Sequence, residues 1–598
     1  MGTSLRALGV GETASEHTAY DQSGNAVEHV SWNGQDQLAT VGASGLPVAQ
    51  TDSATAGGAA AITTSSVYNL DGALTHRDVV AQLGPTATPA TAAYRYDAGY
   101  NQDDWLTISN DDGLRSGYGR DSLGRLTRLS YYIATPGPTS TRVPPASGSV
   151  TYGLDPAGLA TVIKDSEVPA VGLGYDQDNR LVSESLPGGV AATATVDGAG
   201  RLIELRLSGP TASATPIGTA TPTNLDGTYD YSYDPLGRTT QASAVVNGQT
   251  AAVASVTPDA AGRLGDATIT DATHAGVASH WDYDPSGNLQ DVKTGGSVAA
   301  QYSYDPNNPE QLTGLSGPGL PTLALSQYDA NGNPGQLDGG AGQHAVALNY
   351  DARGRLASYV RADDGAGAQL TYNALGQRTG FTWHTAGTAS YALRYQYRGT
   401  QLAQLVVVPS PTPMGTAVPA VIPPECNAND PQGCVDTFIY QQGGAPLELL
   451  YTPAKNGITQ HYWYSLDGRG SVVALTDANG QVVDRYAYDL WGKPTTLSEQ
   501  VPQPFLYAGY VYDRELADPG AATGWYWLSV RHYDPATGRF IQPDPSEREG
   551  TPSYVYCYCD ECLSGNQAQL LPAARISGTV HPGYSGVARV SSTLKSGS

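Results

Sequence analysis

A short phrase recurs along the chain and limits its possible folds more than any other feature of the sequence. Its general form is aromatic-x-Tyr-Asp-x-x-Gly-Arg/Asn-Leu, and its best copies are residues 231–238 (YSYDPLGR) and 281–289 (WDYDPSGNL). Asp favours the first position of a type I turn, Pro with its fixed φ fits the second, and Gly fits the last because it tolerates positive φ. Each copy therefore predicts a hairpin turn between two strands.

The copies stay in register over most of the chain. Successive turn positions are mostly 21–25 residues apart, and the two longer gaps hold Pro-, Thr- and Ser-rich insertions near 132–147 and 208–226. Asn replaces Gly twice, and Asn is the other residue that best tolerates the left-handed region. The predicted turn-defining residues are Gly124, Gly158, Asn179, Gly200, Gly237, Gly262, Gly287, Asn308, Gly332, Gly354 and Gly376.

A chain of such hairpins predicts an all-β fold. Alternate residues of a strand face one side, so Tyr302 and Tyr304, or Leu348 and Tyr350, form an apolar stripe on the strand that enters a turn. One hairpin cannot bury this stripe, so neighbouring repeats must add their strands side by side into one antiparallel sheet. A twisted sheet rarely exceeds about ten strands without curling. We therefore expect a long curled sheet rather than an ordinary β-sandwich.

Charge and hydropathy exclude several classes of function. The formal net charge of −24 leaves no basic field for binding nucleic acid through the main body of the chain. The sequence has no apolar run of about 18 residues, so it predicts no transmembrane segment. Residues 1–18 lack the apolar core of a signal peptide. An extracellular location then rests on other features, or on the chain being a piece of a longer one.

The recurring phrase resembles the YD or RHS repeat, which occurs in bacterial RHS proteins, in the C component of Tc insecticidal toxins and in teneurin ectodomains. The resemblance covers residues 20–545. A more specific likeness lies in residues 462–477, 486–492 and 533–545, which are similar to the RHS-associated core. The resemblance implies that the curled, spiralling sheet forms a hollow shell and that the associated core plugs one end of it.

Resemblance and composition together divide the chain into four expected parts. Residues 1–400 are the YD-repeat β-shell, 401–436 a Pro-rich loop with two cysteines, 437–545 the RHS-associated core, and 546–598 a short variable or truncated tail. The 52 residues after Ser546 are fewer than an independent domain usually needs without further cross-links. We therefore expect no intact toxin domain in this chain.

Family members that carry a cargo free their C-terminal domain by an aspartate-dependent self-cleavage, and the resemblance implies Arg531 and Asp544 as the corresponding residues. Such a cut needs one carboxyl as acid and another as base, with pKa values that the environment separates. The family's second Asp-Pro-x-Gly motif is absent from residues 560–567, and the first reads Asp-Pro-Ser-Glu at 544–547. The sequence therefore favours a shell that does not cut itself.

The cysteines lie outside the repeat. Cys426 and Cys434 flank a loop and are candidates for a disulfide in an oxidising compartment. The remaining thiols and a distant histidine offer zinc ligands but lack a second paired motif. We therefore expect an unordered tail there, without a metal or cofactor. These residues are Cys557, Cys559, Cys562 and His581.

The histidines and tryptophans near the C-terminal end suggest packing rather than catalysis. No nucleophile motif such as Gly-x-Ser-x-Gly accompanies His461 or His532, so the sequence predicts no hydrolase triad. We expect His532 to pack beside Arg531 in the core. We also expect residues 525–527 (WYW) to pack inside the fold rather than to stack on a carbohydrate.

Three functions fit this sequence. The first is an extracellular scaffold, secreted or attached to the cell surface, that encloses or presents a C-terminal segment in toxin delivery or contact-dependent competition. The second is a cell-surface adhesion or glycan-binding structural protein, and the third is an aspartate-dependent self-cleaving shell. The expected partners are the chain's own C-terminal segment or a cargo inside the shell, and a target-cell surface or glycan outside it. A conventional soluble enzyme is not predicted.

Overall fold

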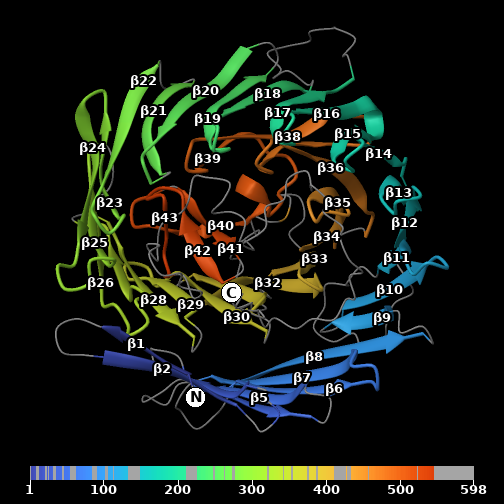
Figure 1. Cartoon of the computed structure of the whole chain (residues 1–598), viewed down its shortest axis with the longest axis horizontal. Helices are drawn as coiled ribbons and strands as arrows, with labels where there is room; N and C mark the ends of the chain where they lie inside the picture. The colour runs from blue at the N-terminus through green and yellow to red at the C-terminus, as the bar shows by residue number, and fades with distance from the viewer. Residues whose placement is uncertain are drawn as a thin grey trace, which may run out of the picture.

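The computed structural model is an all-β fold and describes residues 2–543 with gaps (Figure 1). Gly262, Asp544, the three C-terminal cysteines and His581 lie outside the described residues. No helix in the described part of the chain is long and apolar enough to cross a membrane. The gaps are 8–12, 21–22, 24–25, 31–35, 43–45, 54–61, 84–89, 102–105, 112–113, 132–147, 167, 211–224, 247–248, 262, 272–275, 319–321, 341–342, 352–353, 374–375, 386–387, 410–425, 427–432, 455–456, 522 and 529.

A 39-stranded sheet dominates the fold, and each of its strands pairs antiparallel with the next strand in sequence. The first strands are β1 Gly2–Ala7, β2 Thr13–Tyr20, β3 Ala26–Val30, β4 Asp36–Val41, β5 Pro47–Ser53, β6 Ile62–Tyr68, β7 Leu74–Leu83, β8 Ala90–Tyr100 and β9 Leu106–Asp111.

The middle strands form the main wall of the molecule. They are β10 Leu114–Arg120, β11 Leu126–Tyr131, β12 Gly148–Leu154, β13 Ala160–Asp165, β14 Val171–Tyr175, β15 Leu181–Leu186, β16 Val190–Val196, β17 Leu202–Ser208, β18 Asp226–Tyr233, β19 Thr239–Val246, β20 Gln249–Pro258, β21 Leu264–Asp271, β22 Val277–Tyr283, β23 Leu289–Thr294, β24 Ser297–Tyr304, β25 Leu312–Ser316, β26 Leu323–Ser326, β27 Gln336–Asp338, β28 Ala345–Tyr350, β29 Leu356–Arg361, β30 Gly367–Tyr372, β31 Arg378–Thr385 and β32 Thr388–Arg398. A short 3₁₀ turn, Pro187–Gly189, separates β15 from β16.

The last strands of the sheet lie inside this wall, and a separate four-stranded sheet follows them. The inner strands are β33 Gln401–Pro409, β34 Cys434–Tyr440, β35 Pro446–Pro453, β36 Gln460–Leu466, β37 Val472–Thr476, β38 Val482–Tyr488 and β39 Pro494–Ser498. We name the four-stranded sheet the plug; it consists of β40 Val511–Ala517, β41 Gly524–Leu528, β42 Arg531–Asp534 and β43 Arg539–Phe540, after a 3₁₀ turn at Tyr507–Gly509.

The residues of the recurring phrase form a clasp at the turns where Arg follows Asp four residues later. Between β18 and β19, the Asp234 Oδ1 accepts hydrogen bonds from the backbone N–H groups of Leu236 and Arg238, both at 2.9 Å. The Asp234 Oδ2 accepts another from the Arg238 Nε at 2.6 Å, and Gly237 has a φ of +87°. The Arg238 Nη1 then donates to the carbonyl oxygen of Asp259 in the next such turn, at 3.4 Å. The clasp thus ties neighbouring repeats together.

The predicted turn glycines in the described part of the chain all have positive φ, and so does Asn179 at +63°. Asn308 differs, because it is not among the described residues with positive φ. Its turn is longer: the Asp305 N–H bonds to the carbonyl oxygen of Gln311, so Pro309 and Glu310 add two residues to the loop. The prediction that Asn308 replaces a left-handed glycine was therefore wrong.

The tyrosine before the turn provides a second link between repeats. The Tyr233 hydroxyl donates to the carbonyl oxygen of Leu202 at 2.8 Å, and the Tyr372 hydroxyl donates to that of Leu356 at 2.8 Å. The strand bulges at this tyrosine, as the register shift between Ser232 and Tyr233 illustrates. Each tyrosine therefore packs its ring while satisfying its hydroxyl on the preceding repeat.

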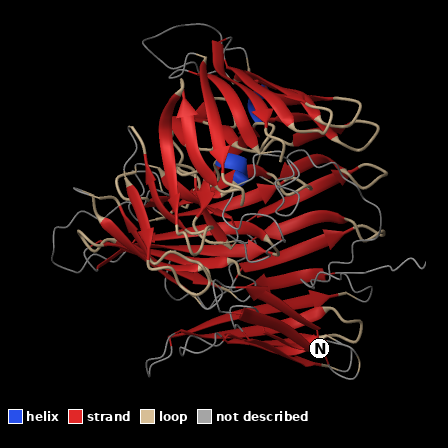
Figure 2. Cartoon of the chain, turned by 60° about the vertical axis from the view of Figure 1, so that its left-hand side comes forward, coloured by secondary structure: helices blue, strands red, loops and turns tan. Residues whose placement is uncertain are grey.

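The sheet curls until its later strands lie inside its earlier ones (Figures 1 and 2). The wall meets itself where the Arg398 Nε of β32 donates to the Ser116 Oγ of β10 at 3.2 Å. The inner strands then follow the inside of the wall, and the Gly468 N–H donates to the Tyr231 hydroxyl at 3.0 Å. The largest buried cluster joins the wall from β24 onward to the inner strands and the plug, so the main core lies inside the curl.

Two of the expected domain limits do not match the observed strands. Residues 401–409 form the buried strand β33 rather than part of a Pro-rich loop, and β34 begins at Cys434. The prolines of this region follow Val408, whereas the run from Leu405 to Val407 is apolar and lies in the core. The sheet also continues through residue 437 to Ser498 without a break, so the predicted start of the associated core is not a boundary of the sheet.

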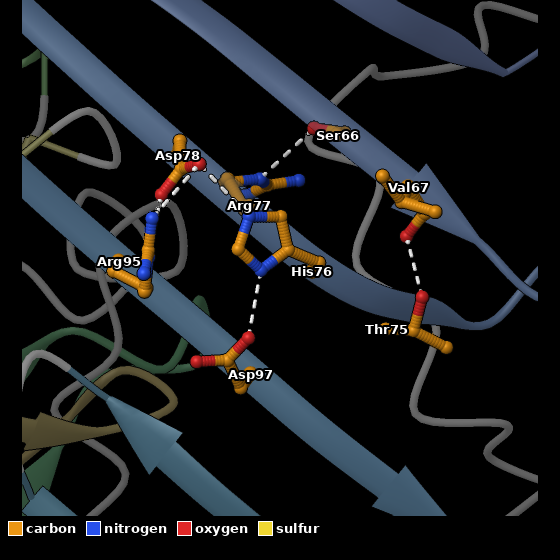
Figure 3. Close-up of polar contacts among 8 residues, drawn as sticks. All are labelled: Ser66, Val67, Thr75, His76, Arg77, Asp78, Arg95 and Asp97. Atoms are coloured by element: carbon orange, nitrogen blue, oxygen red, sulfur yellow. Dashed lines mark hydrogen bonds and ion pairs between the residues drawn. The ribbon is translucent and has the colours of Figure 1, made fainter.

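A partly exposed charge cluster crosses β7 and β8 (Figure 3). The His76 Nδ1 lies 2.7 Å from the Asp97 Oδ1, and the His76 Nε2 lies 2.9 Å from the Asp78 Oδ2. The Arg95 Nε donates to the Asp78 Oδ1 at 2.9 Å. The hydrogen bonds to Asp97 and Asp78 raise the pKa of His76 above its usual value of 6.5. We name these four residues the outer cluster.

Candidate functional site

The plug is held to the inside of the wall by hydrogen bonds between residues far apart in sequence. The Tyr359 hydroxyl of β29 donates to the carbonyl oxygen of Ala517 at 2.8 Å. The Tyr302 hydroxyl of β24 donates to the carbonyl oxygen of Thr537 at 3.1 Å. Both tyrosines point inward from the wall because alternate residues of a strand share one face. Tyr302 lies on a strand that enters a turn and Tyr359 on a strand that returns from one, so both kinds of strand hold the plug.

A buried ion pair also links wall and plug. The Arg378 Nη1 and Nη2 donate to the two carboxylate oxygens of Asp513 at 2.6 and 2.8 Å, and the Nη2 also donates to the Tyr395 hydroxyl at 2.9 Å. The guanidinium carbon lies 4.7 Å from the Trp527 ring centroid. Arg378 and Asp513 are 0% and 4% exposed, so this planar, bidentate pair is almost completely shielded from water.

His532 completes this group, which we name the inner cluster: Arg378, Asp513 and His532. The His532 Nε2 lies 3.3 Å from the Asp513 Oδ2. Burial lowers the pKa of His532, although Asp513 opposes the shift. Burial alone would raise the pKa of Asp513, but the charge of Arg378 lowers it below its usual value. The inner cluster therefore holds a charged Arg–Asp pair beside a neutral imidazole at neutral pH.

A pair of acidic residues, separate from the Arg378–Asp513 ion pair, lies inside the plug. Burial raises the pKa of both Asp518 and Asp534, and the charge of Asp534 raises that of Asp518 further. Two buried carboxyl groups with raised pKa values disfavour two negative charges side by side. Asp534 also accepts hydrogen bonds from the Ala536 and Thr537 N–H groups at 2.9 and 3.0 Å. Asp518 and Asp534 thus form a buried acidic pair with raised pKa values.

This pair borders a pocket between plug and wall. The pocket has a volume of about 350 Å³ and is lined on the wall side by leucines of β25 to β27. Asp518, Asp534 and Ile541 line its plug side. Ile541 and Gln542 are buried, and the Gln542 Oε1 accepts a hydrogen bond from the His532 N–H at 2.7 Å. The last described residues therefore run past an acidic pair in the interior.

The predicted site residues have different positions relative to this pair. Arg531 is buried, with its guanidinium carbon 3.6 Å from the centroid of the Phe540 ring, whereas Asp544 lies outside the described residues. Their predicted role in cleavage therefore stays a prediction. Cys426 and Cys434 form a disulfide. The Asp518–Asp534 pair was missed, and its only signal in the sequence is an Asp-Pro dipeptide at each position.

The fold and its interior define a class of protein: a repeat scaffold whose curled antiparallel sheet surrounds its own later strands. No protein-family model matches the chain. The chain is 29% identical over 277 residues to a tRNA3(Ser)-specific nuclease, WapA of Bacillus spizizenii, a match that covers 45% of this chain and 10% of that protein. It is 34% identical over 135 residues to the tRNA nuclease WapA of Bacillus subtilis, covering 19% and 5% of the two chains.

A similarity to a solved structure covers more of the chain but is distant. The crystal structure of TcdB2-TccC3-TEV covers 91% of this chain and 33% of that one, at 13% identity and a TM-score of 0.41. The chain's matches span a tenth or less of the length of the two WapA proteins. The similarity to those proteins therefore concerns a region of each.

Proposed function

We propose that this chain is the scaffold of an RHS-type toxin-delivery protein, acting in the extracellular space or on the cell surface, and that its curled sheet encloses the segment after residue 543. The path of the chain is the main observation that supports this proposal. The chain passes from the wall to the inner strands and then to the plug, and Ile541 and Gln542 are 7% and 2% exposed. A segment that continues from these residues begins inside the curl.

Two further observations support the proposal. The partial similarity to two proteins named as tRNA nucleases favours a role beside a toxin, while the net charge of −24 argues against nucleic-acid binding by the described scaffold itself. The Cys426–Cys434 disulfide is typical of proteins in oxidising compartments, which favours an extracellular location.

Protection from a protease tests the enclosure. We would insert the recognition sequence of a site-specific protease after Ser546 in one variant and between Gly295 and Gly296 in another. The second position is an exposed turn between β23 and β24, so it is a matched control for protease activity on the folded chain. We expect cutting at the turn and protection after Ser546, with protection lost in urea. Equal cutting of both folded variants contradicts the proposal.

The Asp518–Asp534 pair favours self-cleavage as a second function. In a pair that holds one proton, one carboxyl can protonate the leaving amide nitrogen while the other accepts a proton from the attacking water. Water then adds a hydroxyl to the carbonyl carbon as the C–N bond breaks, and the nitrogen keeps a hydrogen. We expect two fragments of the 62.3 kDa chain on a denaturing gel and one band for Asp518→Asn. A single band for the unaltered chain excludes this function.

A further inference from the structure

Glu184 is out of place on the inner face of the wall. Alternation along β15 puts Val182, Glu184 and Leu186 on one face, and the strand register places Glu184 beside Ala192 of β16. Ala192 in turn pairs with Leu207 of β17. The carboxyl group of Glu184 therefore stands in the middle of an aliphatic surface, where an uncompensated charge is costly.

A cavity of about 620 Å³ lies over this surface, between β15 to β17 and the inner strands. Small side chains at Ala192 and Ala194 leave room opposite Glu184, and larger aliphatic side chains surround them. Ligand pockets in proteins are mostly apolar and have a few polar groups among their lining residues. The aliphatic residues that line the cavity are Leu181, Leu186, Val190, Leu205 and Leu207.

A second carboxyl group faces the same cavity from the inner strands. Asp467 begins a turn of the recurring phrase, but Ser471 stands where Arg238 stands in the clasp of the wall. Burial raises the pKa of Asp467, and the charge of Arg469 offsets part of this shift. The Glu184 Oε1 accepts a hydrogen bond from the neutral Gln441 Nε2, and burial raises the pKa of Glu184 to about 7. The cavity thus has one carboxyl group from the wall, another from the inner strands, and aliphatic walls.

We propose that this cavity binds a primary alkylammonium group, with the ammonium at the Glu184 carboxyl and the alkyl chain against the leucines of β15 to β17. Charge complementarity selects the ammonium, because the ionised Glu184 carboxylate would otherwise place a negative charge among aliphatic side chains. An ammonium on an alkyl chain arises either in a free amine or in a lysine side chain, and both present the same group. This site is independent of the proposed enclosure of the C-terminal segment.

Calorimetric titration of the full chain tests the site. At about pH 8, above the pKa of Glu184, we expect n-pentylammonium to bind about tenfold or more tightly than n-pentanol, because charge-assisted hydrogen bonds exceed neutral ones by this amount. Binding of the ammonium should weaken below about pH 6, where Glu184 is protonated. Nα-acetyl-lysine amide is the second probe: binding of it favours a lysine side chain as the natural occupant, and failure to bind favours a free amine.

Three variants decide whether the binding occurs in this cavity. Glu184→Gln keeps the acceptor for Gln441 and should remove the preference for the ammonium over the alcohol. Ala192→Leu fills the cavity and should abolish binding of both probes, whereas Thr193→Leu on the exposed face of the same strand should leave binding unchanged. Equal affinity for ammonium and alcohol, or unchanged binding in Ala192→Leu, overturns the proposal. Circular dichroism of each variant checks that the sheet has formed.

Discussion

The outer and the inner cluster contain the same kinds of residue in opposite environments. Each cluster contains one histidine and one arginine whose side chains contact aspartate side chains on neighbouring or facing strands. In the outer cluster the Arg95 side chain is 64% exposed, whereas in the inner cluster Arg378 is 0% exposed. Hydrogen bonds to carboxylates raise the pKa of His76, while burial lowers that of His532.

This contrast shows that burial in the inner or outer layer, rather than the types of residue, determines how much a charged group contributes to stability. In the outer cluster water screens each charge, so breaking a contact leaves a group that water can solvate. In the inner cluster a broken pair leaves a charge with no solvent around it. The plug is therefore attached to the wall by the kind of contact that costs most to break.

Removing the arginine of each cluster should show the largest difference in stability between the two clusters. Arg378→Met leaves Asp513 as an unpaired buried charge, so we expect a loss of about 3–5 kcal/mol in the free energy of opening the plug. Arg95→Met should cause a far smaller loss in its own strands, because water replaces the lost contact. Hydrogen exchange of amides in the plug and in β7 and β8 measures both. Equal losses would show that burial does not distinguish the clusters.

The two histidines should respond to pH in opposite directions. The folded-state pKa of His532 is lowered, so as pH falls below 6.5 the unfolded chain binds a proton first and stability is lost until the pH reaches the folded-state pKa. The folded-state pKa of His76 is raised, so its contribution is full below 6.5 and is lost as pH rises through that folded-state value. Each slope is at most about 1.4 kcal/mol per pH unit.

Denaturant unfolding from about pH 8 to about pH 5, with His532→Gln and His76→Gln beside the unaltered chain, isolates these two effects. The difference between each variant and the unaltered chain is the quantity to compare, because other groups also titrate in this range. Burial raises the pKa of Asp484 to about 7, for example, so its contribution falls as pH rises from about 4 to about 7. Differences of the same sign for both histidines would contradict the contrast between the clusters.

The sequence predicts the local part of this architecture well, because each turn depends on residues within a few positions of one another. Asp234, Gly237 and Arg238 all lie in one phrase, and their spacing is enough to predict the hairpin. The curled all-β sheet follows from repeating that phrase. The cavity at Glu184 was not predicted, although the sequence contains one signal for it: Glu184 interrupts an alternating aliphatic pattern between Val182 and Leu186.

The rest depends on contacts that no local pattern encodes. Arg378 and Asp513 are 135 residues apart and meet only because the sheet curls once before the plug folds inside it. The same turn phrase occurs at Asp234 in the wall and at Asp467 in an inner strand, so the phrase does not tell which layer a copy joins. The Pro-rich composition of residues 401–436 predicts a loop, but residues 401–409 form strand β33 because most of them are aliphatic.

The clasp can be tested within a single turn. Gly200 has a φ of +84°, so Gly200→Ala should cost about 1–2 kcal/mol, the penalty for an L side chain in the left-handed region. Gly198, in the same turn, is not among the described residues with positive φ, and an added Cβ there meets no atom within 4 Å. Gly198→Ala is thus the matched control and should be neutral or slightly stabilising. Thermal unfolding of both variants compares them, and equal losses would mean that backbone strain does not determine the turn.

The tyrosine links should show the smallest effect and still separate the layers. Tyr372→Phe removes the partly buried hydrogen bond to the Leu356 carbonyl, and we expect a loss of about 1 kcal/mol because that oxygen is left without its donor. The Tyr68 hydroxyl bonds to the carbonyl oxygen of Pro47 at 3.1 Å in an exposed position, where water can replace it, so Tyr68→Phe should cost less. Denaturant unfolding measures both losses. If Tyr68→Phe lowers the free energy of unfolding as much as Tyr372→Phe does, burial does not determine what a tyrosine link contributes. The ion pair between Arg378 and Asp513, rather than a drier layer of the wall, would then account for the stability of the plug.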